Sequence, residues 1–175
     1  MLASCFCASA IAFSISPELL VERFDNALAK GEPVNMFDLD RALLISNDLA
    51  GASVSGGLAK GSKDGESRMV LLSEARPLFA GNASIDNFGS RPTGPIRFTG
   101  DTSLNSALGY GEQFTALGMH SSGSDYARLG AGIPVHPSGT KLSLSGSYMA
   151  YNVVTPSLRL QDIHGNTTTV NAELS

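Results

Sequence analysis

The feature that most constrains this chain is a strict alternation of apolar and polar side chains in its C-terminal half. Within residues 96–105, Ile96, Phe98, Gly100, Thr102 and Leu104 alternate with Arg97, Thr99, Asp101, Ser103 and Asn105. A period of two places successive side chains on opposite faces of a β-strand. Residues 140–151 repeat the pattern. Two interpretations stay open: one face of a sheet packs on a core, or one face contacts lipid around a polar lumen.

Composition fits β structure in either setting. The chain has 175 residues, of which 42% are hydrophobic and only 16% charged, with 19 glycines and no tryptophan. Such a composition suits strands with tight turns better than a helical bundle. No apolar run reaches the roughly 18 residues of a transmembrane helix, but a barrel strand needs only about 9–11.

The sequence argues against several function classes. The net charge is −4 and the basic residues are scattered, so nucleic-acid binding has little electrostatic support. Cys5 and Cys7 lack companions at metal-ligand spacing, and His120, His136 and His164 are far apart. Neither a nucleophile elbow nor a phosphate-binding loop is complete. We therefore predict a protein that is not an enzyme and has no cofactor or metal.

The N-terminal half predicts two helices and a hairpin. Ser16 followed by Pro17 is a helix start, and Gly31 is a helix stop. A second helix is predicted from Asn35 toward Leu49. Two strands, 52–59 and 67–75, are joined by a glycine-rich turn at 61–65. The second of these strands is a candidate edge for binding an extended client by strand addition.

After Pro77 only strand patterns remain. Six strands are predicted, at 78–86, 95–105, 112–121, 125–135, 140–151 and 167–174. The third is ambiguous, because Phe114 and His120 share a face. The connections at 106–111 and 136–139 are compact, whereas 152–166 is longer, which fits a meander with short turns at one end and longer loops at the other.

Four motifs, in order, resemble a known family. Residues 31–43 resemble a helix of a periplasmic POTRA domain, and residues 61–67 its hairpin. Residues 86–94 resemble the "D-N-x-G-S-x-x-T-G" signature that follows a first barrel strand, and 105–112 resemble "N-x-x-L-G-x-G-D". Together these motifs resemble the outer-membrane transporters of two-partner secretion, the haemolysin and filamentous-haemagglutinin activation/secretion proteins.

This resemblance implies an α+β POTRA remnant followed by antiparallel transmembrane β-barrel strands, an incomplete barrel of about six strands. It implies a partial POTRA domain over 17–77 in the periplasm and the first barrel strands over 78–175 in the cell outer membrane. It implies transport of a large partner exoprotein of the haemolysin or adhesin type, in contact with outer-membrane lipid. No oligomeric state is implied. The chain is expected to be a fragment of a truncated, degenerate or misannotated gene.

Two sets of site residues follow. The resemblance marks a loop motif, made of Asp86, Asn87, Gly89, Ser90, Thr93 and Gly94. These are turn-forming types, so a tight loop between antiparallel strands explains most of them. In a barrel, Arg97, Asp101, Arg128 and Lys141 would line the lumen. The same charges could instead form the solvated face of an ordinary sheet.

Two further questions stay open at this point. Residues 1–16 are an extension of unclear status, in which residues 8–13 are a degraded export signal, a short strand, or the product of a wrongly placed start codon. The alternative to a transporter is a soluble β-rich binding or adhesive module with a small helical cap.

Overall fold

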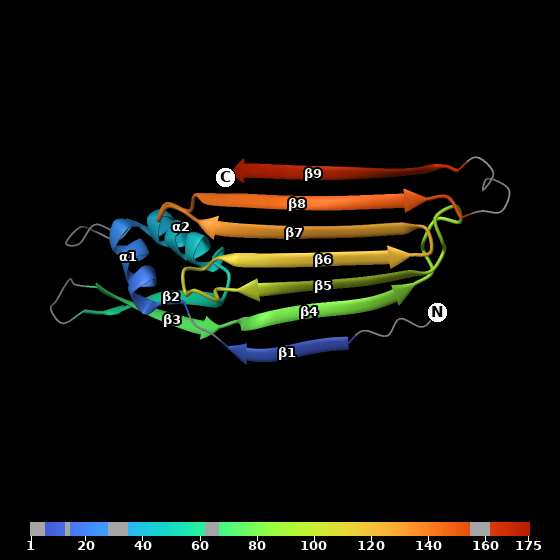
Figure 1. The fold of residues 1–175 in the computed structure, drawn as a ribbon. Coiled ribbons are helices and arrows are strands. Elements are labelled where there is room, and N and C mark those ends of the chain that lie inside the picture. The colour runs from blue at the N-terminus through green and yellow to red at the C-terminus, as the bar shows by residue number, and fades with distance from the viewer. Residues whose placement is uncertain (1–5, 13–14, 28–34, 62–66, 155–161) are drawn as a thin grey trace.

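The structure, a computed structural model, describes all residues except 1–5, 13–14, 28–34, 62–66 and 155–161. Figure 1 shows a long antiparallel sheet with two helices and a hairpin gathered at one end of its strands. The sheet is open, with β1 at one edge and β9 at the other (Figure 1). The predicted helix stop at Gly31 and most of the predicted turn at 61–65 lie outside the described residues.

The helices and the hairpin have the predicted positions. Helix α1 spans Pro17–Ala27 and helix α2 spans Met36–Asn47, while strands β2 (Ala52–Lys60) and β3 (Ser67–Ala75) form the hairpin. Asn35 is the N-cap of α2: its Oδ1 accepts a hydrogen bond of 3.1 Å from the Phe37 amide. This bond satisfies an amide that has no partner within the helix.

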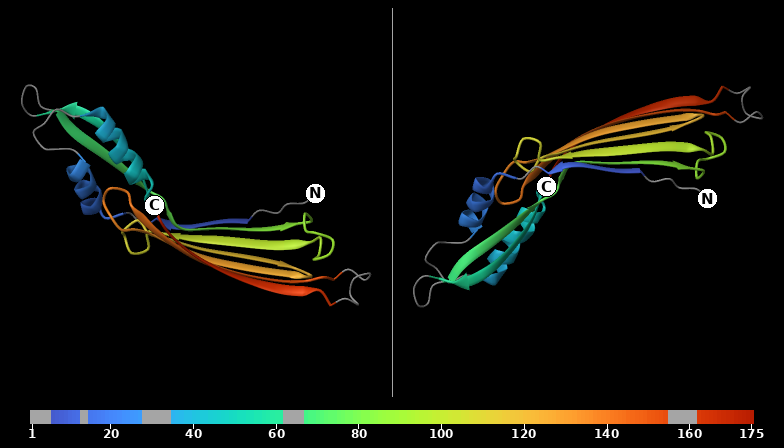
Figure 2. Two further views of the ribbon diagram at one scale, coloured as in Figure 1. Left: turned by 90° about the horizontal axis from the view of Figure 1, so that it is seen from above. Right: turned by 90° about the horizontal axis from the view of Figure 1, so that it is seen from below.

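The apolar core lies in this helix–hairpin unit, where α2 runs along the hairpin (Figure 2). The buried apolar side chains of the described residues are Ile15, Leu20, Phe24, Leu39, Ala42, Leu49, Ala52 and Val54. None of them belongs to the long sheet. The sheet is therefore held by its backbone ladders and by cross-strand side-chain pairs rather than by a core of its own.

The long sheet contains the six predicted strands, each within three residues of its expected bounds. They are β4 (Pro77–Asp86), β5 (Arg97–Asn105), β6 (Gln113–Ser121), β7 (Ser124–Pro134), β8 (Lys141–Asn152) and β9 (His164–Leu174). Each pairs antiparallel with the next along the chain. The alternation read from the sequence therefore predicted both the strands and their order.

A seventh strand corrects the expected count of about six. Strand β1 (Phe6–Ala12) pairs antiparallel with β4, with Ala10 opposite Phe79. Of the three interpretations of residues 8–13, the short strand is the one that the structure contains. The reason is that β4 would otherwise present a row of unpaired backbone groups, and an uncharged segment nearby can pair with them.

The expected separation of short turns from long loops holds only in part. At the end that carries the helices, 106–112 and 135–140 connect neighbouring strands. At the opposite end, 87–96 and 153–163 are longer, but Ser122 and Gly123 alone join β6 to β7. This two-residue turn is held against the end of β8, where the Asn152 amide donates to the Gly123 carbonyl at 2.8 Å.

Candidate functional site

One face of the long sheet is apolar from β4 to β9. Residues directly opposite each other in an antiparallel pair share a face. The register places Phe79 opposite Leu104, Leu104 opposite Phe114, and Phe114 opposite Ala131. Continued along every strand, this face carries Gly81, Ala83, Ile85, Phe98, Gly100, Thr102, Ala116, Gly118, Ala127, Leu129, Ile133, Leu142, Leu144, Gly146, Tyr148, Ala150, Val170, Ala172 and Leu174, with the polar Asn166 and Thr168 at the start of β9. We call it the apolar face.

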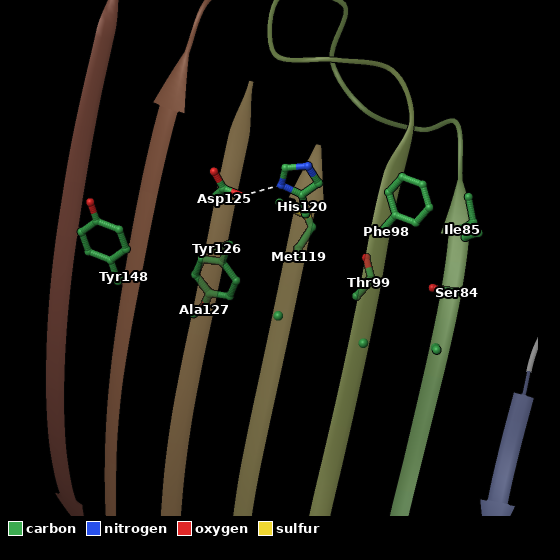
Figure 3. A pocket seen from close by; sticks show the side chains of 13 residues that line it. Ser84, Ile85, Phe98, Thr99, Met119, His120, Asp125, Tyr126, Ala127 and Tyr148 are labelled. Atoms are coloured by element: carbon green, nitrogen blue, oxygen red, sulfur yellow. Dashed lines mark hydrogen bonds and ion pairs between the residues drawn. The ribbon is translucent and has the colours of Figure 1, made fainter. Parts of the chain in front are cut away.

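The apolar face is uncovered. Leu129, in the middle of β7, is 68% exposed, and Val170 in β9 is 80% exposed. Near one end, Ile85, Phe98 and Tyr148 lie around a shallow hollow of about 700 Å³ (Figure 3). Soluble monomers rarely expose an apolar patch beyond a few hundred Å². A face that crosses six strands therefore indicates a surface covered by another apolar phase or partner.

His120 resolves the ambiguity of the third strand. Phe114 and His120 both belong to the apolar face, as their shared parity requires. Figure 3 shows His120 at the end of the strand, directed toward Asp125, with its Nδ1 2.6 Å from Asp125 Oδ1. The polar pair is therefore confined to the rim of the apolar face, beside the turn at Ser122.

The opposite face is polar and carries the predicted lumen residues. Arg97 donates to both carboxylate oxygens of Asp86, at 2.9 and 3.1 Å, across the β4–β5 pair. Arg128 donates to Ser145 Oγ at 3.3 Å. Asp101 lies on the same face between Asn82 and Leu117. The structure brings these charges to one face and pairs some of them across strands, with polar neighbours such as Ser103, Thr115, Ser143, Thr169 and Asn171.

Lys141 differs from the other three predicted lumen residues. It belongs to the polar face by parity, but it is the first residue of β8 and reaches the helix–hairpin unit. Its Nζ donates to the backbone oxygen of Asp48 at 2.6 Å and contacts the Asp48 carboxylate. Because Asp48 is the C-cap of α2, this cation also faces the negative end of the helix dipole. The side chain of Lys141 therefore contacts the C-terminus of α2, whereas the other three residues lie along the polar face.

The loop motif does more than connect two strands. Asp86 Oδ1 accepts from the Phe88 amide at 3.0 Å, and the Gly89 amide donates to Pro95 O at 2.9 Å, which closes the loop. Thr93 O then accepts from the Gly123 amide and from Ser121 Oγ, both at 2.8 Å. The carbonyls of Thr93 and Pro92 thus accept the hydrogen bonds that tie the loop to the β6–β7 turn and to residue 154.

The remaining motif residues allow this docking. Gly94 has φ +107°, and a Cβ there would overlap the Oγ of Ser122. A Cβ on Gly89 would overlap the carbonyl oxygen of Gly94. The Thr93 amide donates to Ser90 O at 3.2 Å, and Asn87 lies between the two anchored ends. The turn-forming residues predict a tight loop, whereas the attachment of this loop to two other connections is a feature of the three-dimensional structure.

Substitution of Gly94 by alanine is expected to destabilise the chain by about 1–3 kcal/mol, because a positive φ and a blocked Cβ position combine there. The measurement is the free energy of unfolding in detergent. Gly118→Ala is the matched control: Gly118 has an ordinary φ and nothing within 4 Å of its Cβ position. It should change stability by less than about 1 kcal/mol. Equal losses for both variants would contradict the docking role of the loop.

The turn at 106–112 forms a second docked connection, at the helix end of the sheet. Glu112 is 2% exposed, and its carboxylate accepts from the Leu108 amide at 2.5 Å and the Tyr110 amide at 3.1 Å. Ser106, fully buried with φ 53°, accepts at Oγ from the Gly111 amide at 3.2 Å. The buried carboxylate therefore fixes the shape of the whole turn.

This turn presses against the helix–hairpin unit. Gly111 O accepts from the Ala50 amide at 3.3 Å, and a Cβ on Gly111 would lie 2.8 Å from Leu49. Gly51, with φ +102°, leaves room for Ser106. Glu112 belongs to the 105–112 motif, but the motif alone does not mark it as a site residue. The signal in the sequence is an acidic residue that follows a Gly-Tyr-Gly turn. In the structure, Gly109 and Gly111 of this turn both adopt positive φ.

The described residues offer no catalytic or metal constellation. Across the ranges that the structure describes, no three His, Cys, Asp or Glu side chains gather as metal ligands. In the same ranges, neither helix is long and apolar enough to cross a membrane. His136 bonds to Ser138 within its own connection, and His164, the first residue of β9, bonds to the Asp162 carbonyl just before it.

No family model matches the chain. The chain is similar to the heme/hemopexin transporter protein HuxB of Haemophilus influenzae, with 24% identity over 66% of this chain and 21% of HuxB. It is also similar to the outer membrane transporter CdiB of Dickeya dadantii, with 29% identity over 53% of this chain and 17% of CdiB. The chain thus spans about a fifth of the length of these relatives.

Two solved structures share the fold. CdiB from Escherichia coli matches 98% of this chain and 37% of its own, with a TM-score of 0.68 and 17% identity. BamA from Haemophilus ducreyi, in a form lacking POTRA domains 1–3, matches 92% and 30%, with a TM-score of 0.62 and 13% identity. The resemblance to two-partner secretion transporters is confirmed by the similarity to HuxB and CdiB. Because HuxB and CdiB are transporters, this similarity also agrees with the prediction that the chain is not an enzyme.

Proposed function

We propose that this chain, which is related to the two-partner secretion transporters, is part of an outer-membrane β-barrel that passes a secreted exoprotein across the membrane. The apolar face contacts the hydrocarbon, and the polar face lines an aqueous lumen. The single observation that carries the proposal is the separation of the two faces over six consecutive strands. A barrel wall needs such a separation, because lipid lies on one side of it and water on the other.

Strand length fits this proposal. Strand β7 has 11 residues, which at about 3.3 Å per residue extend roughly 36 Å. A tilt of about 40° reduces that span to about 28 Å, close to the roughly 25 Å apolar band of outer-membrane barrels. The His120–Asp125 pair lies at the end of this span, where it can reach the interface with water.

The helix–hairpin unit is proposed to be the POTRA remnant, located in the periplasm. It lies at the end of the sheet where 106–112 and 135–140 connect the strands, and both connections contact it. In this orientation the motif loop at 87–96 lies at the cell surface. The exposed residues of β3, including Leu72 at 65%, keep this strand as the candidate edge for an extended client.

The polar face suits the passage of an unfolded polypeptide. Arg97 is neutralised by Asp86, and hydroxyl and amide side chains are the commonest others on this face, which also carries the charged Asp101, Arg128, Lys141 and Glu173 and the apolar Leu117, Met119 and Met149. A wet wall of mixed polarity gives an extended client few apolar contacts to adhere to. The client is proposed to be a large exoprotein of the haemolysin or adhesin type.

Spin labels at Phe98 and Thr99 test the orientation of the two faces. Phe98 is 51% exposed on the apolar face, and Thr99 is its neighbour on the polar face. In the chain reconstituted in lipid vesicles, collisions with oxygen should dominate at position 98, and collisions with a water-soluble nickel chelate at position 99. Equal accessibility of both labels to both reagents would contradict the proposal.

The second candidate, a soluble β-rich binding module, has a distinct expectation. A soluble module would remain monomeric and unfold cooperatively without detergent. The uncovered apolar face favours the membrane protein, so we expect aggregation when detergent is removed. Sedimentation velocity with and without detergent measures the difference.

A further inference from the structure

A cavity lies between the helix–hairpin unit and the sheet, where α1, α2 and the 135–140 connection meet. Its volume is about 500 Å³. The polar side chains that line it are Arg23, Asn26, Asp38, Arg41, His136 and Ser138. Two arginines therefore face one aspartate, and the cavity carries an excess of positive charge and of hydrogen-bond donors.

Arg23 is the central observation. It is only 7% exposed, and its Nε has no hydrogen-bond partner among the residues that the structure describes. Within that part of the chain its hydrogen bond runs from Nη1 to Pro137 O at 3.4 Å, longer than usual for this bond type. Burial lowers the pKa of the guanidinium from its ordinary value, but an arginine keeps its charge in proteins. The charge of Glu22 opposes this lowering, but no carboxylate of the described residues forms an ion pair with Arg23 or accepts from its Nε. A buried guanidinium with an unsatisfied donor is costly, so the site is incomplete without an acceptor.

His136 and Arg41 add further hydrogen-bond donors to the cavity. The Ser138 amide donates to His136 Nδ1 at 3.1 Å, which makes Nδ1 an acceptor and places the imidazole proton on Nε2. His136 therefore presents a donor while uncharged. Arg41 is exposed and makes no ion pair with any residue that the structure describes. A planar guanidinium with several free donors matches the oxygens of a phosphate group.

We propose that this cavity binds a phosphate group, carried by a phospholipid headgroup or present as the free anion. The cavity borders the strand ends at which the sheet meets the helix–hairpin unit, so a headgroup could enter from the neighbouring bilayer surface. Bound phosphate then neutralises Arg23 and joins α1, α2 and the 135–140 connection through one ligand.

Inorganic phosphate, titrated into the full chain in a phosphate-free maltoside detergent, is the first probe. Binding is measured by 31P NMR, against sodium chloride at equal ionic strength. Arg23→Met should weaken phosphate binding at least about tenfold, equivalent to about 1.4 kcal/mol, and Arg41→Gln several-fold. Asp38→Asn should strengthen it, because a carboxylate of the cavity lining, which repels an anion, is removed.

Arg91→Met is the matched control, since Arg91 is an exposed arginine in the loop at the opposite end of the sheet. It should bind phosphate as the parent does. Arg41→Gln removes an exposed side chain and keeps the test valid if Arg23→Met does not fold. The proposal is overturned if the parent binds neither inorganic phosphate nor dihexanoyl phosphatidylglycerol, or if Arg23→Met and Arg41→Gln bind the ligand as well as Arg91→Met.

A second titration distinguishes the two sources of phosphate. Dihexanoyl phosphatidylglycerol, used below its critical micelle concentration, replaces inorganic phosphate as the ligand. Tighter binding of the lipid than of the free anion, lost in Arg23→Met, assigns the site to a headgroup. Binding of the free anion alone assigns it to a soluble phosphate. Failure of both ligands overturns the proposal.

Discussion

Replacement of Leu129 by arginine is expected to destabilise the chain in a lipid bilayer by about 2–4 kcal/mol, the range for a cation at the midplane of a barrel's lipid face. Leu129 lies halfway along β7, 68% exposed, opposite Ala116 on one side and Gly146 on the other. In lipid, its side chain contacts hydrocarbon, and an arginine there has no nearby water or carboxylate. The measurement is urea unfolding of the chain folded into vesicles.

Thr169→Arg is the matched control for this prediction. Thr169 is exposed in β9 and lies opposite Ser147, so it belongs to the polar face at a similar height in the sheet. The same added charge should cost less than about 1 kcal/mol there, because water solvates it. Similar losses in the two variants would show that lipid does not distinguish the faces.

The apolar face could be predicted from the sequence because a strand has a fixed period. Once residues 96–105 are read as a strand, Phe98 and Leu104 must share a face, and antiparallel pairing extends that face to Phe114 and Ala131. The N-cap at Asn35 was equally predictable, since its bond to Phe37 is local. Local patterning thus determined the strands, the helix starts and the faces.

The contacts between connections could not be predicted in this way. Lys141 and Asp48 are 93 residues apart, and Thr93 bonds Ser121 across 28 residues. No period or motif in the sequence states which turns meet. Strand β1 shows the same limit: residues 6–12 contain no charge or breaker that fixes their partner, and the free edge of β4 decides it.

Replacement of Glu112 by alanine is expected to cost about 3 kcal/mol or more of folding free energy. The carboxylate accepts two backbone amides, from Leu108 and Tyr110, and hydrogen bonds to a charged group contribute about 1.5–3 kcal/mol each. Alanine removes both bonds and leaves a cavity with two unpaired amides in the turn. Since this turn also contacts Leu49 and Ala50, the loss should reach the helix–hairpin unit.

Two readouts separate this local role from a general loss of stability. Amide hydrogen exchange should accelerate at Leu108 and Tyr110 before it does in the middle of β6, because those two amides lose their acceptor. Glu112→Gln should lie between the parent and the alanine variant, since its amide group retains one acceptor oxygen but turns a second donor toward the amides. Gln113→Ala is the control, an exposed side chain with one hydrogen bond to Asn105, and should cost less than about 1 kcal/mol. Unchanged protection of Leu108 and Tyr110 in Glu112→Ala would mean that the backbone alone shapes the turn.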